Sequence, residues 1–198
     1  MIPKEQLKEL YTLKNYSSKQ IGAILGCSET KINYWMRKHH IKKRSVSEAV
    51  YIKWNPDGDP FKIKTPANVE EAILYGLGLG LYWGEGTKSN KFSIRLGNTD
   101  PYLIKKFIEF LTNMYGINKE KLKFGLQVFN DMSGKKALQF WQKHLNARLS
   151  QFQKLIITPA RSLGTYHNKS QYGVLTVYYN NKKLRDIFMS AIENIQKI

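Results

Sequence analysis

The sequence predicts an α+β protein in which an all-helical region precedes a region of helices and strands. Three observations carry this prediction. Residues 4–44 contain three short helical patterns separated by turn residues. Residues 69–198 follow the order helix, strand, helix, strand, helix, strand, strand, helix, read from hydrophobic periods near 3.6 and 2. Prolines, glycines and asparagines interrupt the chain between them, so we expect domains at 1–44 and 69–198 and a linker at 45–68.

The first 44 residues predict three helices around a small core. The first ends near Asn15, Ser17 or Ser18 caps the second, and Ser28 caps the third, which runs from Glu29 to Lys38. The expected core residues are Leu7, Leu10, Tyr11, Ile21, Ile24 or Leu25, Ile32 and Trp35. The second and third helices, with the turn Gly26-Cys-Ser28 between them, resemble helix-turn-helix domains.

In that resemblance the third helix enters the major groove of DNA. The residues on or beside its exposed face that we expect to contact bases and phosphates are Thr30, Lys31, Asn33, Tyr34, Arg37 and Lys38, followed by the basic run Lys42, Lys43 and Arg44. A three-helix bundle that binds protein is the alternative. His39 and His40 have no further ligands at metal-site spacing, so we expect them to end the helix.

The composition predicts a polyanionic partner. The formal net charge is +17, and both parts of the chain are basic: residues 1–65 carry 13 basic and 6 acidic side chains. A membrane-surface protein, or one that is merely soluble and basic, is the alternative. Cys27 is the only cysteine and the N-terminus has no apolar signal region, so we expect a cytoplasmic protein without a membrane partner or small-molecule cofactor.

The stretch from Glu70 to Gly86 predicts a helix with an unusual number of glycines. Gly76, Gly78, Gly80 and Gly84 together cost roughly 3–4 kcal/mol relative to alanine. Three of them, Gly76, Gly80 and Gly84, recur every four residues and form one face, which we call the glycine seam. A second backbone can approach closely there, so the seam predicts tight helix packing.

This helix ends on a single carboxylate, Glu85, between Gly84 and Gly86. An anion at the negative end of a helix dipole favours a nearby cation, and a divalent metal is the natural candidate. A membrane span is excluded by length, and a phosphate-binding glycine loop by the position of the glycines inside the helix. A plain buried core helix remains as the alternative.

The nine residues from Gly78 to Gly86 resemble a divergent motif of the LAGLIDADG homing endonucleases. Gly80, Leu81 and the pair Glu85-Gly86 match that motif, whereas Trp83 stands where the family usually has its first acid. The resemblance implies that motif helices pair, that Glu85 binds Mg²⁺, and that helices back a saddle-shaped DNA-binding sheet. The helix predicted between the first two strands departs from the family's usual order.

The remaining pattern predicts the sheet and its helices. Alternating strands run over Lys91–Gly97 and from Lys121 to Val128, and two further strands lie near residues 152–158 and 172–179. Boundary residues are Thr65-Pro66 or Asn68 for the glycine-rich helix, Asp100 and Gly116 for the next helix, and Asn181 for the last. A further helix is expected over residues 134–145. The polar sheet face that we expect along DNA carries Lys91, Arg95, Lys121, Lys123 and Gln127.

The leading hypothesis is a homodimeric DNA endonuclease joined along the glycine seam. Each Glu85 would hold Mg²⁺, and Lys88 or Arg95, or else Arg148, Arg161 or Lys169, would neutralise the reacting phosphate. A regulator that binds DNA without cutting it is the second hypothesis, and an RNA-binding or RNA-processing factor the third. A seam that packs against the helix at 101–115 would leave a monomer.

Overall fold

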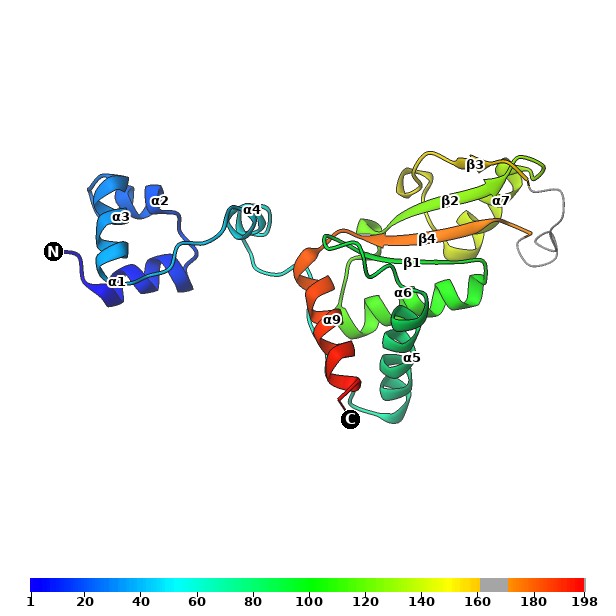
Figure 1. Ribbon diagram of the computed structural model, residues 1–198, viewed down its shortest axis with the longest axis horizontal. Coiled ribbons are helices and arrows are strands. Elements are labelled where there is room, and N and C mark those ends of the chain that lie inside the picture. Colours follow the sequence, from blue (N-terminus) through cyan, green and yellow to red (C-terminus); the bar gives the residue numbers. More distant parts are fainter. Residues whose placement is uncertain (161–170, 198) are drawn as a thin grey trace. The chain divides into compact units, whose positions relative to one another are not determined.

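The computed structural model describes residues 1–160 and 171–197. It forms two compact units, Met1–Asp59 and Pro60–Ile198. The first consists of helices, and the second combines helices with a four-stranded mixed, open sheet (Figure 1). At this level the predicted α+β class is confirmed.

The N-terminal unit contains short, individually capped helices. These are α1 (Lys4–Lys8), the π-helical turn η1 (Glu9–Leu13), α2 (Ser18–Ile24), α3 (Glu29–Lys38) and α4 (Val46–Trp54). Ser17 accepts a hydrogen bond from the backbone of Gln20, and Ser28 from that of Lys31, so both predicted caps are confirmed. Gly26 makes the turn between α2 and α3 with φ +62°.

The core of this unit differs from the prediction on α3. Ile32 and Met36 are fully buried four residues apart on one helical face, whereas Trp35 is only half-buried and stacks on His39. Ile24 is exposed. The helix α2 packs close to the turn because Gly22 lacks a side chain: a Cβ there would lie 2.6 Å from the carbonyl oxygen of Cys27.

The stretch expected to be a linker contains α4. Ser45 accepts from the backbone of Glu48, and the Glu48 carboxylate accepts from the backbone of Ser45, which forms a capping box. None of the residues of α4 is buried, so capping rather than core packing defines this helix. The prolines and glycine that predicted the linker lie after it, from Pro56 onward.

The second unit follows the predicted order of helices and strands. Its elements are α5 (Val69–Glu85), β1 (Ile94–Asn98), α6 (Pro101–Tyr115), the 3₁₀ turn η2 (Lys119–Lys121), β2 (Lys123–Phe129), α7 (Gly134–Leu145), the 3₁₀ turn η3 (Leu149–Gln151), β3 (Ile156–Thr158), β4 (Val174–Tyr179) and α9 (Lys182–Ile195). The predicted boundary residues Asn68, Asp100 and Asn181 cap α5, α6 and α9. Gly116 ends α6 in the left-handed region.

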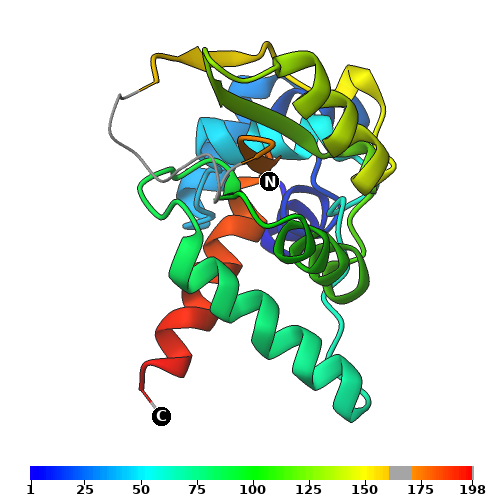
Figure 2. The same cartoon turned by 90° about the vertical axis from the view of Figure 1, so that its right-hand side faces the viewer.

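The strands lie in the order β1-β4-β2-β3. The pairs β1–β4 and β4–β2 are antiparallel, and β2–β3 is parallel. The helices α5, α6 and α9 lie on one side of this sheet, with α9 beside α5 (Figures 1 and 2). The apolar side chains of β1, β2 and β4 point to that side and form the core, so the opposite sheet face is left open.

Two strands are shorter than predicted. The first begins at Ile94, not at Lys91, because the Asn90 side chain accepts from the backbone N–H groups of Phe92 and Ser93 and forms a turn there. Phe92, in the turn before this strand, is exposed, and Ser93 is buried. Similarly, β3 comprises only Ile156–Thr158.

Within the described residues, no helix is both long and apolar enough to span a membrane.

Candidate nucleic-acid interface

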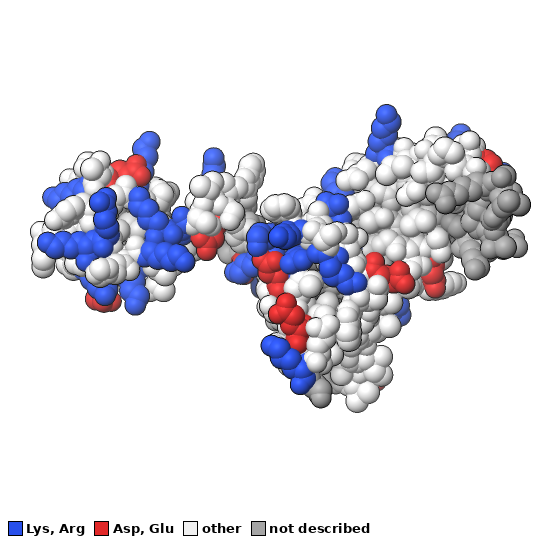
Figure 3. All heavy atoms as spheres, in the orientation of Figure 1, with Lys and Arg blue, Asp and Glu red and all other residues white. Residues whose placement is uncertain are grey.

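The helix α3 presents a basic and polar surface away from its buried side. Thr30, Tyr34 and Arg37 lie opposite Ile32 and Met36 and are exposed. Lys31 and Lys38 are exposed beside them, and the Lys38 ammonium lies 5.5 Å from the Trp35 ring centroid. Lysine and arginine side chains cover much of the visible surface of this unit in Figure 3.

Asn33 and Arg44 are placed differently from the other predicted contacts. The side-chain oxygen of Asn33 is buried and has no hydrogen-bond partner among the described residues, although the residue as a whole is half-buried. The Arg44 guanidinium donates to the carbonyl oxygens of Tyr11, Asn15 and Tyr16 and stacks on the Tyr11 ring. Arg44 therefore fastens the chain after α3 to η1, and only Lys42 and Lys43 of the basic run are exposed.

The glycines of α5 divide into two sets with opposite surroundings. A Cβ on Gly78 would lie 2.0 Å from the Phe110 ring, and one on Gly86 would lie 2.3 Å from the carbonyl oxygen of Tyr82. A Cβ on any residue of the glycine seam would meet nothing within 4 Å. Thus α6 packs against Gly78, and the expected alternative in which the seam packs against this helix is wrong.

The open face of α5 is apolar as well as small. Ile73 is 64% exposed and Trp83 is 43% exposed, and Val69 and Leu77 lie on the same face at helical spacing. An exposed, contiguous apolar stripe of this kind is typical of a surface that binds another protein. Behind it, Tyr82 is fully buried between Phe107 and Phe188, and burial raises the pKa of its phenol.

The C-terminal end of α5 adjoins the edge of the sheet. Gly86 pairs with Leu96, and the backbone N–H of Thr87 donates to the carbonyl oxygen of Arg95. Glu85 is exposed there, and no hydrogen bond or ion pair holds its carboxylate within the described chain. The Lys88 ammonium lies 3.4 Å from the carbonyl oxygen of Gly84. At this C-terminal end of α5 the helix dipole stabilises a positive charge.

The open sheet face carries a row of polar side chains near this edge. The register places Arg95 of β1 beside Tyr178 of β4, and Tyr178 beside Lys123 of β2. A neighbouring row consists of Gly97, Thr176 and Gly125, so few side-chain atoms project from the sheet there. Gln127 lies further along β2 and is exposed. The structure therefore brings Arg95, Lys123 and Gln127 onto one face, as predicted.

Other predicted contacts lie off this face. Lys91 is in the turn before β1, and Lys121 is in η2, so neither belongs to a strand, although both are exposed. Arg148 forms an ion pair with Glu120. Arg161 and Lys169 lie outside the described residues.

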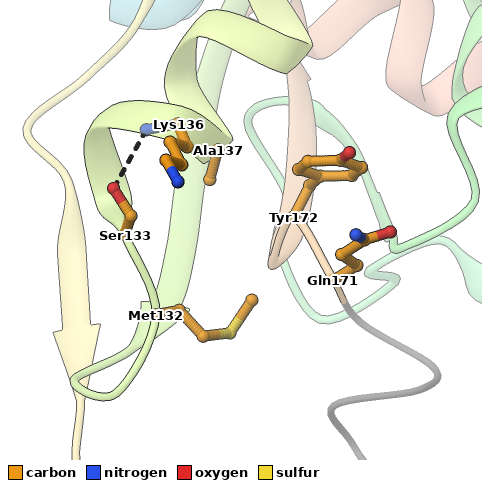
Figure 4. Close-up of a pocket in the computed structure, with 6 residues that line it drawn as sticks. All are labelled: Met132, Ser133, Lys136, Ala137, Gln171 and Tyr172. Atoms are coloured by element: carbon orange, nitrogen blue, oxygen red, sulfur yellow. Dashed lines mark hydrogen bonds between the residues drawn. The ribbon is translucent and has the colours of Figure 1, made fainter.

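The pocket at the start of α7 is separate from these surfaces. Its volume is about 400 Å³, and Figure 4 shows its lining. The lining residues are Met132, Ser133, Lys136, Ala137, Gln171 and Tyr172. None of the predicted site residues is among them, so the candidate interface consists of exposed surfaces, as expected for a partner as large as duplex DNA.

Comparisons with protein families, curated proteins and solved structures found no match to this chain.

The residues that support the sheet edge were not predicted from the sequence. Arg185 of α9 is largely buried and donates to the carbonyl oxygens of Lys88 and Asn90. Asn90 in turn fixes Ser93, which accepts from Arg95. The only signal in the sequence was the pair Asn90 and Ser93, at a spacing typical of an Asx turn.

Proposed function

We propose that this protein binds duplex DNA as a homodimer joined along α5, and that it cleaves the DNA with Mg²⁺ held near Glu85. The observation that carries the proposal is the open, apolar glycine seam, which ends on an unpaired carboxylate beside a basic sheet edge. An unpartnered seam and a single carboxylate are each incomplete in one chain. A two-fold partner completes both.

The packing argument for the dimer is steric. Without side chains on Gly76, Gly80 and Gly84, two copies of α5 can approach until their backbones touch. The exposed side chains of Ile73, Leu77 and Trp83 would be removed from water at the same contact. Each α5 ends at its own sheet edge, so two sheets would flank the dimer axis.

The donor atoms fit Mg²⁺ only in the dimer. In the described part of one chain, no group of three or more histidine, cysteine, aspartate or glutamate side chains is placed to hold a metal ion. Two Glu85 carboxylates, together with phosphate oxygens of the DNA, would supply the oxygen ligands that Mg²⁺ prefers. When bound there, Mg²⁺ would stabilise charge on the scissile phosphate and generate hydroxide.

The chain's own cations would position the substrate. Lys88 lies within one turn of Glu85, so its ammonium can bind a phosphate that flanks the reacting bond. Arg95 lies on the adjoining strand, where it can contact the same duplex. The N-terminal unit adds a second basic surface on α3. Binding through both surfaces would hold the duplex in register with Glu85.

A plasmid assay tests cleavage. The wild-type protein should nick or linearise supercoiled plasmid in Mg²⁺ and not in EDTA. Glu85→Gln should bind DNA with unchanged affinity and lose cleavage. Glu120→Gln is the matched control, because Glu120 is an exposed carboxylate like Glu85 but lies in η2 rather than at the end of α5. Equal cleavage by Glu85→Gln and the wild type would contradict the assigned role of Glu85.

A DNA-binding regulator without cleavage is the second candidate. It is favoured by the lack of a complete metal-ligand group within the described part of one chain, and by Trp83 at the motif position of an acid. In that case the wild type binds duplex DNA as a dimer, and Mg²⁺ produces no nick.

A further inference from the structure

A chain of hydrogen bonds runs from α9 to the open face of the sheet. The Arg185 side chain, 14% exposed, donates from Nε to the carbonyl oxygen of Asn90 at 3.1 Å. The side-chain oxygen of Asn90 accepts from both the backbone N–H and the hydroxyl of Ser93 at 2.9 Å. The Ser93 oxygen accepts from Nε of Arg95 at 2.8 Å.

This chain fixes one edge of the Arg95 guanidinium. Ser93 is 1% exposed, and its only hydroxyl hydrogen is donated to Asn90, so it can act only as an acceptor toward Arg95. On the sheet face, the Arg95 guanidinium carbon lies 5.2 Å from the centroid of the Tyr178 ring. That ring lies over Gly125, where a Cβ would meet it at 2.9 Å.

The two terminal nitrogens of Arg95 remain available. No carboxylate in the described part of the chain forms an ion pair with Arg95, and only its Nε is engaged in a hydrogen bond. A guanidinium held at Nε and against an aromatic ring loses little further freedom on binding. The two terminal nitrogens of Arg95 therefore present a pair of hydrogen-bond donors in a fixed plane.

We infer that Arg95 is a specificity-determining residue that reads one guanine in the major groove, and that Ser93, Asn90 and Arg185 are its positioning residues. The inference rests on the proposed DNA binding and extends it to base recognition. Guanine presents two acceptors, O6 and N7, on its major-groove edge, and a paired arginine donor matches them. The major groove is wide enough for two adjacent strands, and β1 and β4 are such a pair at the edge of the sheet.

Guanine rather than phosphate is the target because of this fixed geometry. A phosphate contact needs only an accessible cation, and Lys123, which ends the same row, provides one. This residue is exposed, and among the described residues its ammonium donates only to the carbonyl oxygen of Ser150. Lys123 is therefore the matched control for Arg95. Both lie on one face and carry one positive charge, but only Arg95 is held in a plane.

Selection from a randomised duplex library with the full-length protein tests the inference. The bound fraction of the wild type should contain a guanine at a fixed position. Replacing that guanine by 7-deazaguanine, which pairs normally but lacks the N7 acceptor, should weaken wild-type binding. Arg95→Ala should lower the discrimination between guanine and adenine there by roughly 5- to 150-fold. Arg95→Lys keeps the charge but lacks the planar pair of donors, so it should keep most of the affinity and lose part of the same preference.

Two further variants separate positioning from charge. Ser93 is buried and cannot touch DNA, yet Ser93→Ala should reduce the preference for guanine at the same position. Lys123→Ala should weaken binding equally on all duplexes and lower the salt slope by about 1. Circular dichroism confirms that each variant is folded.

Four results overturn the inference. An Arg95→Lys variant with the full base preference of the wild type would contradict the fixed guanidinium plane as its cause. Equal losses of Arg95→Ala on every duplex would reduce Arg95 to a phosphate contact. A wild type that binds all duplexes equally contradicts base reading while leaving DNA binding in place. A wild type that binds no duplex at low salt contradicts the proposed function as well.

Discussion

At the scale of single residues, two arginines of the N-terminal unit have different roles. Arg37 is exposed on α3, whereas the Arg44 guanidinium is satisfied by three backbone carbonyl groups. Nothing in the sequence separates them, because both lie in the basic stretch that ends α3 and continues after it. The difference arises from the path of the chain after α3, which brings Arg44 back to η1.

We predict that Arg37→Ala reduces discrimination between DNA sites and that Arg44→Ala reduces stability. A true base contact at Arg37 should contribute about 1–3 kcal/mol to discrimination. Asn33→Ala, predicted from the sequence to act likewise, is the comparison, because its side-chain oxygen is buried. Loss of Arg44 should cost about 1.5–3 kcal/mol in the free energy of unfolding. Urea unfolding measures the loss of stability, and binding to specific and random duplexes measures the discrimination. Equal losses of affinity on the two duplexes would make Arg37 a phosphate contact.

A second residue-scale prediction concerns pH. Hydrogen bonds from Lys64 and from the backbone of Ala67 hold the pKa of Glu71 below its usual range. A carboxyl with a lowered folded-state pKa stabilises the protein above its unfolded-state pKa, and this contribution disappears as the pH falls through the folded-state value. Glu71→Gln should therefore be less stable than the wild type at pH 7, and the two should converge in acid. A difference that is constant from pH 7 to pH 3 would contradict this.

At the scale of elements, α5 contains a matched pair of glycines. A Cβ on Gly78 would strike the Phe110 ring, whereas one on Gly80 would meet nothing. Gly78→Ala should lower the free energy of unfolding by about 1–3 kcal/mol through overpacking. Gly80→Ala should raise it by up to about 1 kcal/mol at concentrations where the protein is monomeric, because alanine favours the helix. Urea unfolding of both variants measures the difference; equal destabilisation would mean that the seam is buried.

The order of the elements in the second unit was predictable, and their ends were only partly so. Caps such as Asp100 and Asn181 are local signals, and the structure bears them out. The start of β1 was wrong because the Asn90 turn competes with strand pairing, a choice that alternation alone does not reveal. The helix α4 was missed because it has no core side to produce a periodic pattern.

At the scale of the molecule, the boundary between the two units lies at Asp59, before the predicted start of the second domain. Phe61 is buried in the core of the second unit, and the backbone N–H groups of Lys62 and Lys64 donate to the end of α6. The sequence did not show this because the alternation of apolar and basic residues over 61–64 is too short to distinguish an ordered segment from a linker. A fragment that retains this segment must begin at Pro60.

We predict that the fragment 60–198 binds DNA more weakly than the whole chain and with a smaller salt slope. Residues 1–59 carry their own basic surface on α3, so their removal takes away part of the phosphate contacts. The fragment keeps Arg95, Lys123 and Gln127 on its open face. Fluorescence anisotropy at several salt concentrations measures both quantities. No binding at low salt would contradict the role of the sheet.

Part of the candidate site could be predicted from the sequence, and the rest depends on the fold. Charge and alternation identified the sheet face, and the four-residue glycine spacing identified the seam. The supporting residue Arg185 is 95 residues from Asn90 along the chain, so only the fold brings them together. Which glycines are open and which pack on α6 also depends on the tertiary structure.

Sedimentation of the full-length protein, alone and with a duplex oligonucleotide, tests the central claim most directly. We expect two protomers per duplex for the wild type. We also expect that Gly80→Val stays folded and fails to pair, because a β-branched side chain on the glycine seam blocks the approach of the second α5. A wild-type protein that is monomeric both on and off DNA would contradict the dimer and, with it, the pairing of the two Glu85 carboxylates.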